Sequence, residues 1–250
     1  MNKIYRLIWS KAKEMWLAVS EKVAAGWYRR PLTVGGLALA ALLAAGAPAR
    51  ALDPNALPTG GQVVAGQAAI AQSGNTMTVS QQTDRLIAQW NSFNIGRDAS
   101  VAFQQPGVSS VALNRILDQN PSQIFGSLAA NGQVFLLNPA GVFFGPTARV
   151  DVGGLVASSL HLANEDFLAG KYSFAGSSTA GAIANQGQIR TAEGGYVAFL
   201  SPRIVQEGTI TAQRGTVAMA AGEKVDLDFT GDRLVHFTVT QGAIDAQIPN

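Results

Sequence analysis

The feature that most constrains the fold is a repeat of about 20 residues near the C-terminal end of the chain. Residues 185–205 align with residues 206–225. The matched pairs are Gly187 with Gly208 and Ile189 with Ile210 at an offset of 21, and, after one gap, Val197 with Val217 and Val205 with Val225 at an offset of 20. A repeat of this length made only of short strands and turns is typical of one coil of a parallel β-solenoid. The alternative is a chance similarity between two glycine-rich hairpins.

Short segments with strand character recur after residue 51. They are rich in β-branched residues, often alternate between apolar and polar positions, and are bounded by Gly, Asn or Pro. The predicted strands are Gln62–Ala65, Thr76–Ser80, Arg85–Trp90, Ser100–Gln104, Ser110–Leu113, Gln133–Leu137, Val142–Phe144, Tyr196–Leu200, Thr216–Ala220 and Lys224–Phe229. After residue 51 a helical period is sustained only at Glu165–Ala169. The sequence therefore predicts an all-β chain, a parallel β-helix whose isoleucine and valine pairs stack as inward rungs.

Two motifs predict tight turns. Asn131-Gly132 can supply the positive φ values that a two-residue type I′ turn requires. Asn138-Pro139-Ala140-Gly141 predicts a type I turn. In such a turn the Asn side chain can hydrogen-bond the backbone ahead of it, Pro presets φ at about −65°, and Gly is favoured at the last position.

The N-terminal part has the organisation of an export signal. Residues 1–30 are basic and aromatic, an uncharged run follows from Pro31 to Ala49, and Ala49-Arg50-Ala51 is a small-x-small cleavage site. We predict cleavage after Ala51, so that residues 1–51 are an unusually long signal peptide. A permanent membrane anchor is the alternative, but four helix-weakening residues interrupt the apolar run: Gly35, Gly36, Gly46 and Pro48. The helical spacing of Trp16, Val19 and Val23 predicts an amphipathic helix in the basic region.

The predicted signal peptide and the rest of the chain carry net charges of opposite sign. Residues 1–51 carry a net charge of +6 and the whole chain carries +2, so residues 52–250 carry −4. A mildly acidic chain without a basic patch argues against nucleic acid as a partner. The absence of cysteine suits a chain that must stay unfolded in an oxidising periplasm, because it cannot form a premature crosslink. The alternative is that many exported proteins simply lack cysteine.

Several longer motifs follow one another along the chain: WNSFNIG at Trp90–Gly96, VAFQQP, VALNRIL, SQIFGSLAANGQVFLLNPAGVFFG and ARVDVGGLVASSL. In this order they resemble the secretion domain of two-partner secretion exoproteins, the filamentous haemagglutinin, haemolysin and contact-dependent-inhibition family. The opening MNKIYRLIW resembles the family's extended signal peptide region. The resemblance implies that residues 52–250 form a right-handed parallel β-helix with an N-terminal antiparallel cap, which we expect at about 52–82.

The resemblance also implies partners and a location. The Sec translocon and signal peptidase would deliver the chain to the periplasm of a Gram-negative bacterium. An outer-membrane barrel with POTRA domains would then export it to the cell surface, where it would nucleate β-helix folding. Such passengers are adhesins, haemolysins or toxins, so host-cell or matrix receptors are expected partners of an adhesin-like exoprotein. The chain ends after only a few coils; a truncated gene, a fragment and a small stand-alone exoprotein all fit.

Two candidate recognition motifs follow from the resemblance. The family's Asn-Pro-Asn-Gly-Ile turn corresponds here to Asn138, Pro139, Ala140, Gly141 and Val142. A second family motif, Asn-Pro-Asn-Leu, is missing, and its region corresponds to Asn114, Arg115 and Ile116. The functional interpretation is recognition by the transporter. The structural interpretation is that Asn138 and Asn114 satisfy backbone groups at coil corners, and both can hold together.

Catalysis is the competing interpretation, because parallel β-helices also serve as polysaccharide lyases and hydrolases. Asp226 and Asp228 lie two apart in a predicted strand and Asp232 and Arg233 follow, but a strand with its polar face in water explains them equally. The two histidines, His161 and His236, have no metal-ligand spacing. We therefore expect no enzyme activity, metal or cofactor. The phenylalanines expected in the core are Phe103, Phe125, Phe135, Phe143 and Phe144.

Overall fold

The computed structural model describes residues 5–10, 15–20, 52–177, 179–229 and 236–242. The chain divides into two compact units, Met1–Asp53 and Pro54–Asn250. In the first unit, β1 (Tyr5–Ser10) and β2 (Met15–Ser20) form an antiparallel ladder. The helix predicted through Trp16 and Val19 is therefore wrong, because β2 exchanges backbone hydrogen bonds with β1; Val23 lies outside the described residues. No helix in the described part of the chain is long and apolar enough to cross a membrane.

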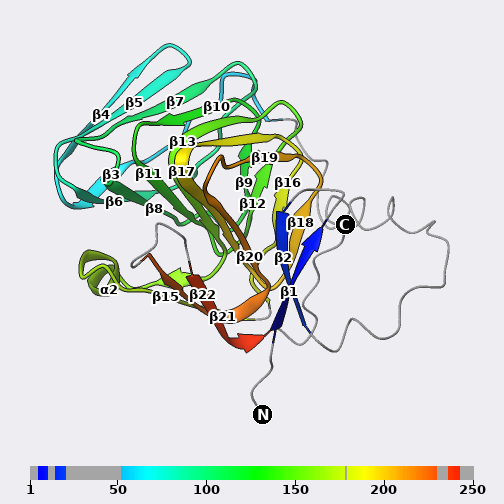
Figure 1. Ribbon diagram of the computed structural model, residues 1–250. Helices are drawn as coiled ribbons and strands as arrows, with labels where there is room; N and C mark the ends of the chain where they lie inside the picture. The colour runs from blue at the N-terminus through cyan, green and yellow to red at the C-terminus, as the bar shows by residue number, and fades with distance from the viewer. Residues whose placement is uncertain (1–4, 11–14, 21–51, 178, 230–235, 243–250) are drawn as a thin grey trace. The chain divides into compact units, whose positions relative to one another are not determined.

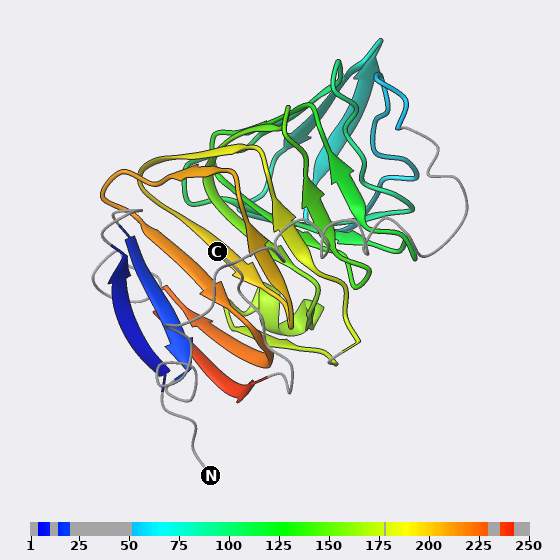
Figure 2. The same ribbon diagram turned by 90° about the vertical axis from the view of Figure 1, so that its right-hand side faces the viewer.

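The second unit is a right-handed parallel β-solenoid of about six coils with three faces (Figure 1, Figure 2). The first face stacks β5 (Thr76–Gln81), β7 (Ser100–Gln104), β10 (Ser127–Ala130), the start of β13 (Arg149–Ser158), the start of β17 (Gln188–Leu200) and β19 (Thr209–Thr211). The second face stacks β6 (Arg85–Trp90), β8 (Val111–Ile116), β11 (Gln133–Leu137), the ends of β13 and β17, and β20 (Thr216–Ala220). The third face stacks β9 (Ser122–Ile124), β12 (Val142–Phe144), β16 (Ile183–Asn185) and β18 (Ile204–Gln206).

The repeat seen in the sequence is confirmed at three of its four matched pairs, and the first of them is the backbone of Gly208 stacked on that of Gly187. Ile189 pairs with Ile210 at the offset of 21, and Val197 pairs with Val217 at the offset of 20. The match of Val205 with Val225 is wrong, because the chain leaves the solenoid after β20. Val225 lies in β21 (Gly222–Asp228), which pairs antiparallel with strands outside the coils.

The N-terminal end is closed by antiparallel strands, as predicted. β3 (Gln62–Ala65) pairs antiparallel with β6, and β4 (Ala68–Ser73) pairs antiparallel with β5. A further antiparallel bridge joins Thr59 to Ser92. Since β5 also pairs parallel with β7, the last strand of the predicted cap is at the same time the first rung of the solenoid.

A second layer covers the outside of the second face. Between β13 and β16 the chain forms β14 (His161–Leu162), α2 (Asn164–Leu168) and β15 (Tyr172–Ala175). β14 and β15 join β21 and β22 (His236–Gly242) in an antiparallel sheet, seen below the coils in Figure 1. Outward-facing side chains of the second face pack with this layer in one apolar cluster, among them Ile87, Leu113, Phe135 and Val156.

This covering layer explains the burial pattern of the strands. The second half of β13, residues 154–158, is buried at every position, whereas buried and exposed residues alternate over the first four positions of the same strand. Strands of a sheet that is buried on both faces are continuously apolar, whereas strands of a sheet with one solvent-exposed face alternate between apolar and polar residues. The helix predicted at Glu165–Ala169 is present as α2, whose Phe167 is fully buried in the second layer.

The turn prediction at Asn131-Gly132 is wrong in type. Neither residue has a positive φ, and β10 and β11 do not pair with each other. They are successive strands of one coil, so the Asn-Gly pair forms the corner between the first and second faces. Of the five phenylalanines predicted to be core, Phe103, Phe135 and Phe144 are buried. Phe125 and Phe143 are only half-buried and form an edge-to-face pair with centroids 5.6 Å apart.

Candidate functional site

The predicted type I turn at Asn138 forms a solenoid corner between the second and third faces. The backbone N–H of Gly141 donates to the carbonyl of Asn138 at 2.8 Å, and Asn138 Oδ1 accepts from the N–H of Ala140 at 2.9 Å. Both bonds are those that the Asn-Pro-x-Gly pattern predicted. Gly141 has φ of +110°, a conformation that a side chain would strain, so Gly is required here.

The same asparagine also ties three coils together. Its side chain is fully buried, and Nδ2 donates to the carbonyl of Asn120 at 3.1 Å and to Ser122 Oγ at 3.0 Å. Its backbone N–H donates to the carbonyl of Ser158 in the following coil at 3.0 Å. Pro139, by contrast, is exposed, and Val142 is buried in β12.

Side-chain oxygens that accept from the N–H two residues ahead recur at other corners. Ser158 Oγ accepts from Leu160 at 2.9 Å, Asn185 Oδ1 from Gly187 at 3.0 Å, and Ser201 Oγ from Arg203 at 3.1 Å. Such Asx and ST turns satisfy the backbone where the chain bends away from the ladder. Asn138 is thus one member of a structural series, which supports the structural interpretation of this motif without testing the functional one.

Asn114 lies in the lumen of the solenoid, where polar groups are costly unless they are paired. Its side chain has zero exposure. Oδ1 accepts from Trp90 Nε1 at 2.9 Å, and Nδ2 donates to the carbonyls of Ala112 at 3.2 Å and Phe135 at 3.3 Å. The residue therefore links the first three coils and supplies the buried tryptophan with its hydrogen-bond acceptor.

Arg115 points the opposite way and holds the second layer against the second face. One guanidinium nitrogen donates to the carbonyl of Leu162 at 2.6 Å and to Asn164 Oδ1 at 2.8 Å, and the other lies 3.0 Å from His161 Nδ1. Burial lowers the pKa of Arg115. Burial, and secondarily the positive charge of Arg115, lower the pKa of His161, so this contact favours a neutral imidazole.

Sequence reasoning missed a second arginine with the same role. Arg85 donates to the carbonyl of Phe167 at 2.7 Å and to the Tyr172 hydroxyl at 2.9 Å. Its guanidinium lies 5.6 Å from the centroid of the Phe167 ring and 5.8 Å from that of Tyr172, within the range of a cation–π contact. The signal in the sequence was an arginine at the start of a strand whose other residues, apart from Gln89, are apolar.

Sequence reasoning also missed a glycine column at the corner between the first and second faces. Its members, one from each of four successive coils, are Gly132, Gly153, Gly195 and Gly215. A Cβ on Gly153 would lie 2.7 Å from the carbonyl oxygen of Gly132, so the backbones approach too closely for any side chain. Two of the three spacings, 21 residues from Gly132 to Gly153 and 20 from Gly195 to Gly215, match the repeat in the sequence. Gly153 and Gly195 are 42 residues apart because the second-layer segment lies between them, so the sequence repeat alone does not reveal this step.

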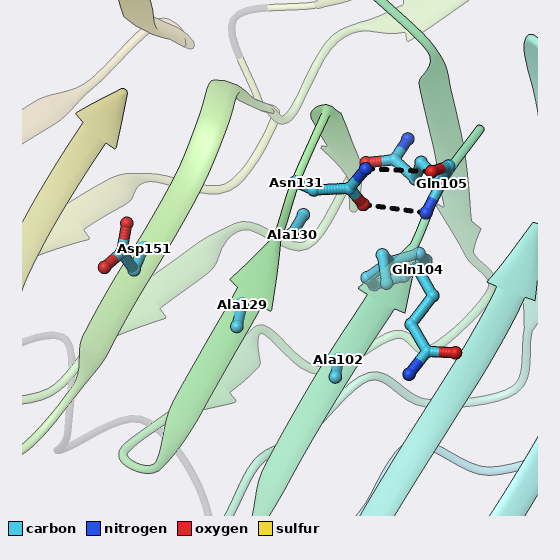
Figure 3. Close-up of a pocket in the computed structure, with 8 residues that line it drawn as sticks. Ala102, Gln104, Gln105, Ala129, Ala130, Asn131 and Asp151 are labelled. Atoms are coloured by element: carbon cyan, nitrogen blue, oxygen red, sulfur yellow. Dashed lines mark hydrogen bonds between the residues drawn. The ribbon is translucent and has the colours of Figure 1, made fainter. Parts of the chain in front are cut away.

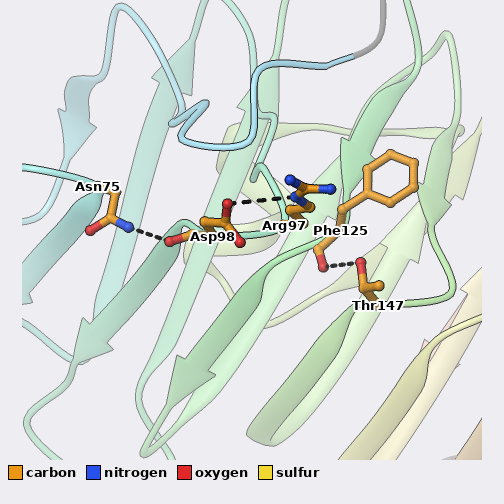
Figure 4. Close-up of polar contacts among 5 residues, drawn as sticks. All are labelled: Asn75, Arg97, Asp98, Phe125 and Thr147. Carbon is orange, nitrogen blue, oxygen red and sulfur yellow. Dashed lines mark hydrogen bonds and ion pairs between the residues drawn. The ribbon is translucent and has the colours of Figure 1, made fainter.

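The corner between the third and first faces is held by backbone contacts of polar side chains (Figure 4). The Asn75 side chain donates to the carbonyl of Asp98, and Arg97 lies 3.5 Å from the Asp98 carboxylate in an exposed ion pair. Thr147 Oγ1 donates to the carbonyl of Phe125 at 2.7 Å. The Asn75 and Thr147 contacts each join one coil or its edge to the next, which is a structural role.

Only two of the acidic residues of the catalytic alternative, Asp226 and Asp228, lie in the described part of the chain. Asp226 is half-buried and Asp228 exposed on the polar face of β21, as the structural interpretation predicted. Asp232 and Arg233 lie outside the described residues. Within the described residues no group of three or more His, Cys, Asp or Glu side chains is placed to hold a metal ion. A shallow, open depression over the first face is lined mainly by alanines and glutamines and has Asp151 as its acidic residue (Figure 3).

The eight candidate recognition residues do not form one exposed patch. In the folded domain Asn114, Ile116, Asn138, Gly141 and Val142 are buried, Arg115 and Ala140 are half-buried, and only Pro139 is exposed. The predicted cleavage residues Ala49 and Ala51 lie outside the described residues. The geometry therefore brings the asparagines into the fold's internal hydrogen bonding rather than onto its surface.

Comparison with known families agrees with this architecture. A family model of the TPS secretion domain matches residues 55–248. The chain belongs to the family of TPS secretion domains. A second model, the extended signal peptide of the type V secretion system, matches residues 1–50.

Relatives and solved structures of this family resemble the chain over much of its length. A heme/hemopexin-binding protein of Haemophilus influenzae is 33% identical over 202 residues, covering 78% of this chain and 22% of that protein. Another protein of the same description and species is 42% identical over 90 residues, covering 36% of this chain and 10% of that protein. The crystal structure of the HMW1 secretion domain from H. influenzae aligns with a TM-score of 0.67 at 30% identity, covering 76% of this chain and 51% of that chain.

Membership of the family fixes the route of the protein. An extended signal peptide followed by a TPS secretion domain marks a secreted exoprotein of a Gram-negative bacterium that passes through the periplasm. The domain implies Sec export and an outer-membrane transporter as its partner. This TPS secretion domain spans about a fifth or less of the curated relatives that it matches.

Proposed function

We propose that this TPS secretion domain directs its exoprotein to a POTRA-containing outer-membrane barrel and nucleates β-helix folding at the cell surface. The observation that carries the proposal is the asymmetry of the solenoid. Its N-terminal end is covered by antiparallel strands, whereas the strands of its last described coil pair on one side only. A solenoid with one closed end can grow only at the other.

The closed end lowers the cost of forming the first coil. A single coil buries little apolar surface. This burial does not offset the entropy lost on closing the coil until a neighbouring coil or strand stacks on it. β3 and β4 supply that neighbour to β6 and β5 from residues close in the sequence. Antiparallel pairing over a short loop is fast to form compared with parallel pairing between coils. Folding is therefore expected to start at the cap.

The open end provides the template for further chain. Among the described residues β18 pairs only with β16, and β19 and β20 pair only with β17. Their outer edges carry backbone groups that a further coil would satisfy. Because a folded coil cannot slide back through a narrow barrel, each coil that stacks outside biases transport outward without a nucleotide.

Burial of the candidate motif residues suits recognition of the chain before it folds. A transporter that contacts Asn114 or Asn138 directly would have to do so in the extended chain, since both side chains are enclosed in the folded domain. In the periplasm the apolar segments of the unfolded chain can bind to the edge of a partner's sheet as an added strand. After export, Asn138 would form its hydrogen bonds at the solenoid corner and Asn114 would form its own in the lumen. Binding of host-cell or matrix receptors stays a prediction.

Two matched leucines test where folding starts. Leu86 in β6 and Leu155 in β13 are both fully buried and stand in the same inward column of the second face, three coils apart. Replacing either by alanine is expected to cost about 2–5 kcal/mol. If the cap end nucleates, Leu86→Ala slows refolding, whereas Leu155→Ala mainly accelerates unfolding. Stopped-flow refolding from denaturant measures both rates.

Secretion provides the second measurement. In cells with the cognate barrel, Leu86→Ala should reduce export more than Leu155→Ala at equal loss of stability. Equal refolding rates and equal export for the two variants would refute nucleation at the cap. Deletion of residues 52–82 removes the whole predicted cap, and undiminished export of that chain would overturn the proposal outright.

A further inference from the structure

The Asn131-Gly132 corner combines a reactive sequence with a tightly held geometry. Asn131 is exposed at the surface, yet both polar atoms of its carboxamide are bonded to the preceding coil (Figure 3). Oδ1 accepts from the backbone N–H of Gln105 at 2.7 Å, and Nδ2 donates to the carbonyl of Gln105 at 2.8 Å. The backbone N–H of Gly132 donates to Gln105 Oε1 at 3.0 Å. One glutamine thus holds both partners of the pair.

We infer that Asn131 is a site of spontaneous deamidation that is open in the unfolded chain and closed by folding. The backbone nitrogen of Gly132 attacks Cγ of Asn131, a C–N bond forms, the bond from Cγ to Nδ2 breaks, and ammonia leaves with the amide proton. Water then opens the cyclic imide at either carbonyl, which gives aspartate or isoaspartate. Glycine favours the attack because it has no Cβ to hinder the backbone nitrogen.

The folded corner blocks this reaction at both reacting groups. The Gly132 nitrogen must lose its proton and turn toward Cγ, but its N–H is committed to a buried acceptor. The carboxamide cannot rotate without breaking both of its bonds to Gln105. Gln105 is itself fixed, because its Nε2 lies within hydrogen-bond distance of Gln81 Oε1 at 3.1 Å, the carbonyl of Ser110 at 3.0 Å and the carbonyl of Gln133 at 3.2 Å. Reaction therefore requires local opening of the corner.

The products would not fit the corner. A carboxylate in place of the carboxamide sets an oxygen against the Gln105 carbonyl where Nδ2 now donates, so a part-buried hydrogen bond is lost and a repulsion is gained. Isoaspartate lengthens the main chain by one methylene beside Gly132. Space beside Gly132 is short, because a Cβ on Gly132 would lie 2.6 Å from the Ser110 carbonyl oxygen. Conversion before folding would thus damage the stacking of the third coil on the second.

Mass-spectrometric peptide mapping of the full-length chain tests the inference. Parallel samples are incubated in mildly alkaline buffer, one folded and one unfolded in guanidinium chloride. Deamidation at Asn131 should be at least about tenfold slower in the folded sample, since it needs local opening. Asn120 and Asn138 are internal controls, because each precedes a proline that has no N–H to attack with. Equal rates in both samples, or no reaction at Asn131 in the unfolded one, would overturn the inference.

A pair of variants tests the consequence for folding. Asn131→Ala removes the two bonds to Gln105, and Asn131→Asp removes the donor and adds the charge of the deamidated product. Asn131→Asp should unfold at a lower denaturant midpoint than the parent at neutral pH, and this gap should narrow in acid, where the protonated carboxyl can again donate to the Gln105 carbonyl. Equal midpoints at neutral pH would refute the proposed damage by the carboxylate.

Discussion

Replacing Asn114 by leucine is expected to destabilise the solenoid by about 2–3 kcal/mol, although leucine is apolar and similar in size. The Asn114 side chain has zero exposure and accepts the hydrogen bond of Trp90 Nε1. Leucine leaves this buried N–H without a partner, which costs about 1–3 kcal/mol. The contacts of Nδ2 with the Ala112 and Phe135 carbonyls are longer, at 3.2 and 3.3 Å, and contribute less.

A double-mutant cycle isolates the bond to tryptophan. Trp90→Phe removes the N–H donor, so Asn114→Leu should cost less in that background, with a coupling energy of at least about 1 kcal/mol. Urea unfolding followed by far-ultraviolet circular dichroism gives the four stabilities, and the slopes should agree if only stability changes. The assignment of Asn114 as the acceptor that stabilises the lumen would be refuted if the two single variants lost free energies of unfolding that simply add in the double variant. A leucine variant as stable as the parent would refute it as well.

The same variant separates folding from recognition. If Asn114 acts only through the fold, Asn114→Leu should lower export no more than Leu155→Ala does at the same stability. A larger export defect at equal stability would instead support direct binding of Asn114 by the transporter.

Three further outcomes are expected. Thr191 has a buried hydroxyl without a hydrogen-bond partner beside Val152, so Thr191→Val should stabilise the domain by about 1 kcal/mol in urea unfolding, and a less stable variant would contradict this. The lowered pKa of His161 means that the folded state binds its proton less readily than the unfolded state. Stability should therefore fall as pH drops through the ordinary histidine value of about 6.5, and His161→Gln should remove this slope; an unchanged slope would exclude His161 as its source. N-terminal sequencing of the exported protein should begin at Leu52, whereas retention of residue 1 or 2 would indicate an uncleaved anchor.

Local chemistry determined the elements whose shape needs no distant partner. The turn at Asn138 is set by its own four residues, because the side-chain acceptor, the fixed proline φ and the glycine all act within the turn. The repeat of Ile189 on Ile210 was readable because stacked coils place like residues one period apart. The export signal was equally readable, since its charge and hydropathy are properties of consecutive residues.

Only the tertiary structure decided which surface each side chain faces. Asn114 and Arg115 are adjacent in sequence, yet one pairs with a tryptophan in the lumen and the other holds the second layer outside. Asn131-Gly132 has the local signature of a hairpin but forms a corner, because its strands pair with the coils above and below instead of with each other. Successive strand residues alternate their side chains by geometry alone, but the partner that each side chain meets comes from residues about 20 to 80 positions away. The sequence by itself therefore determined a secreted β-solenoid and its turn at Asn138, and long-range stacking decided the roles of the individual polar residues.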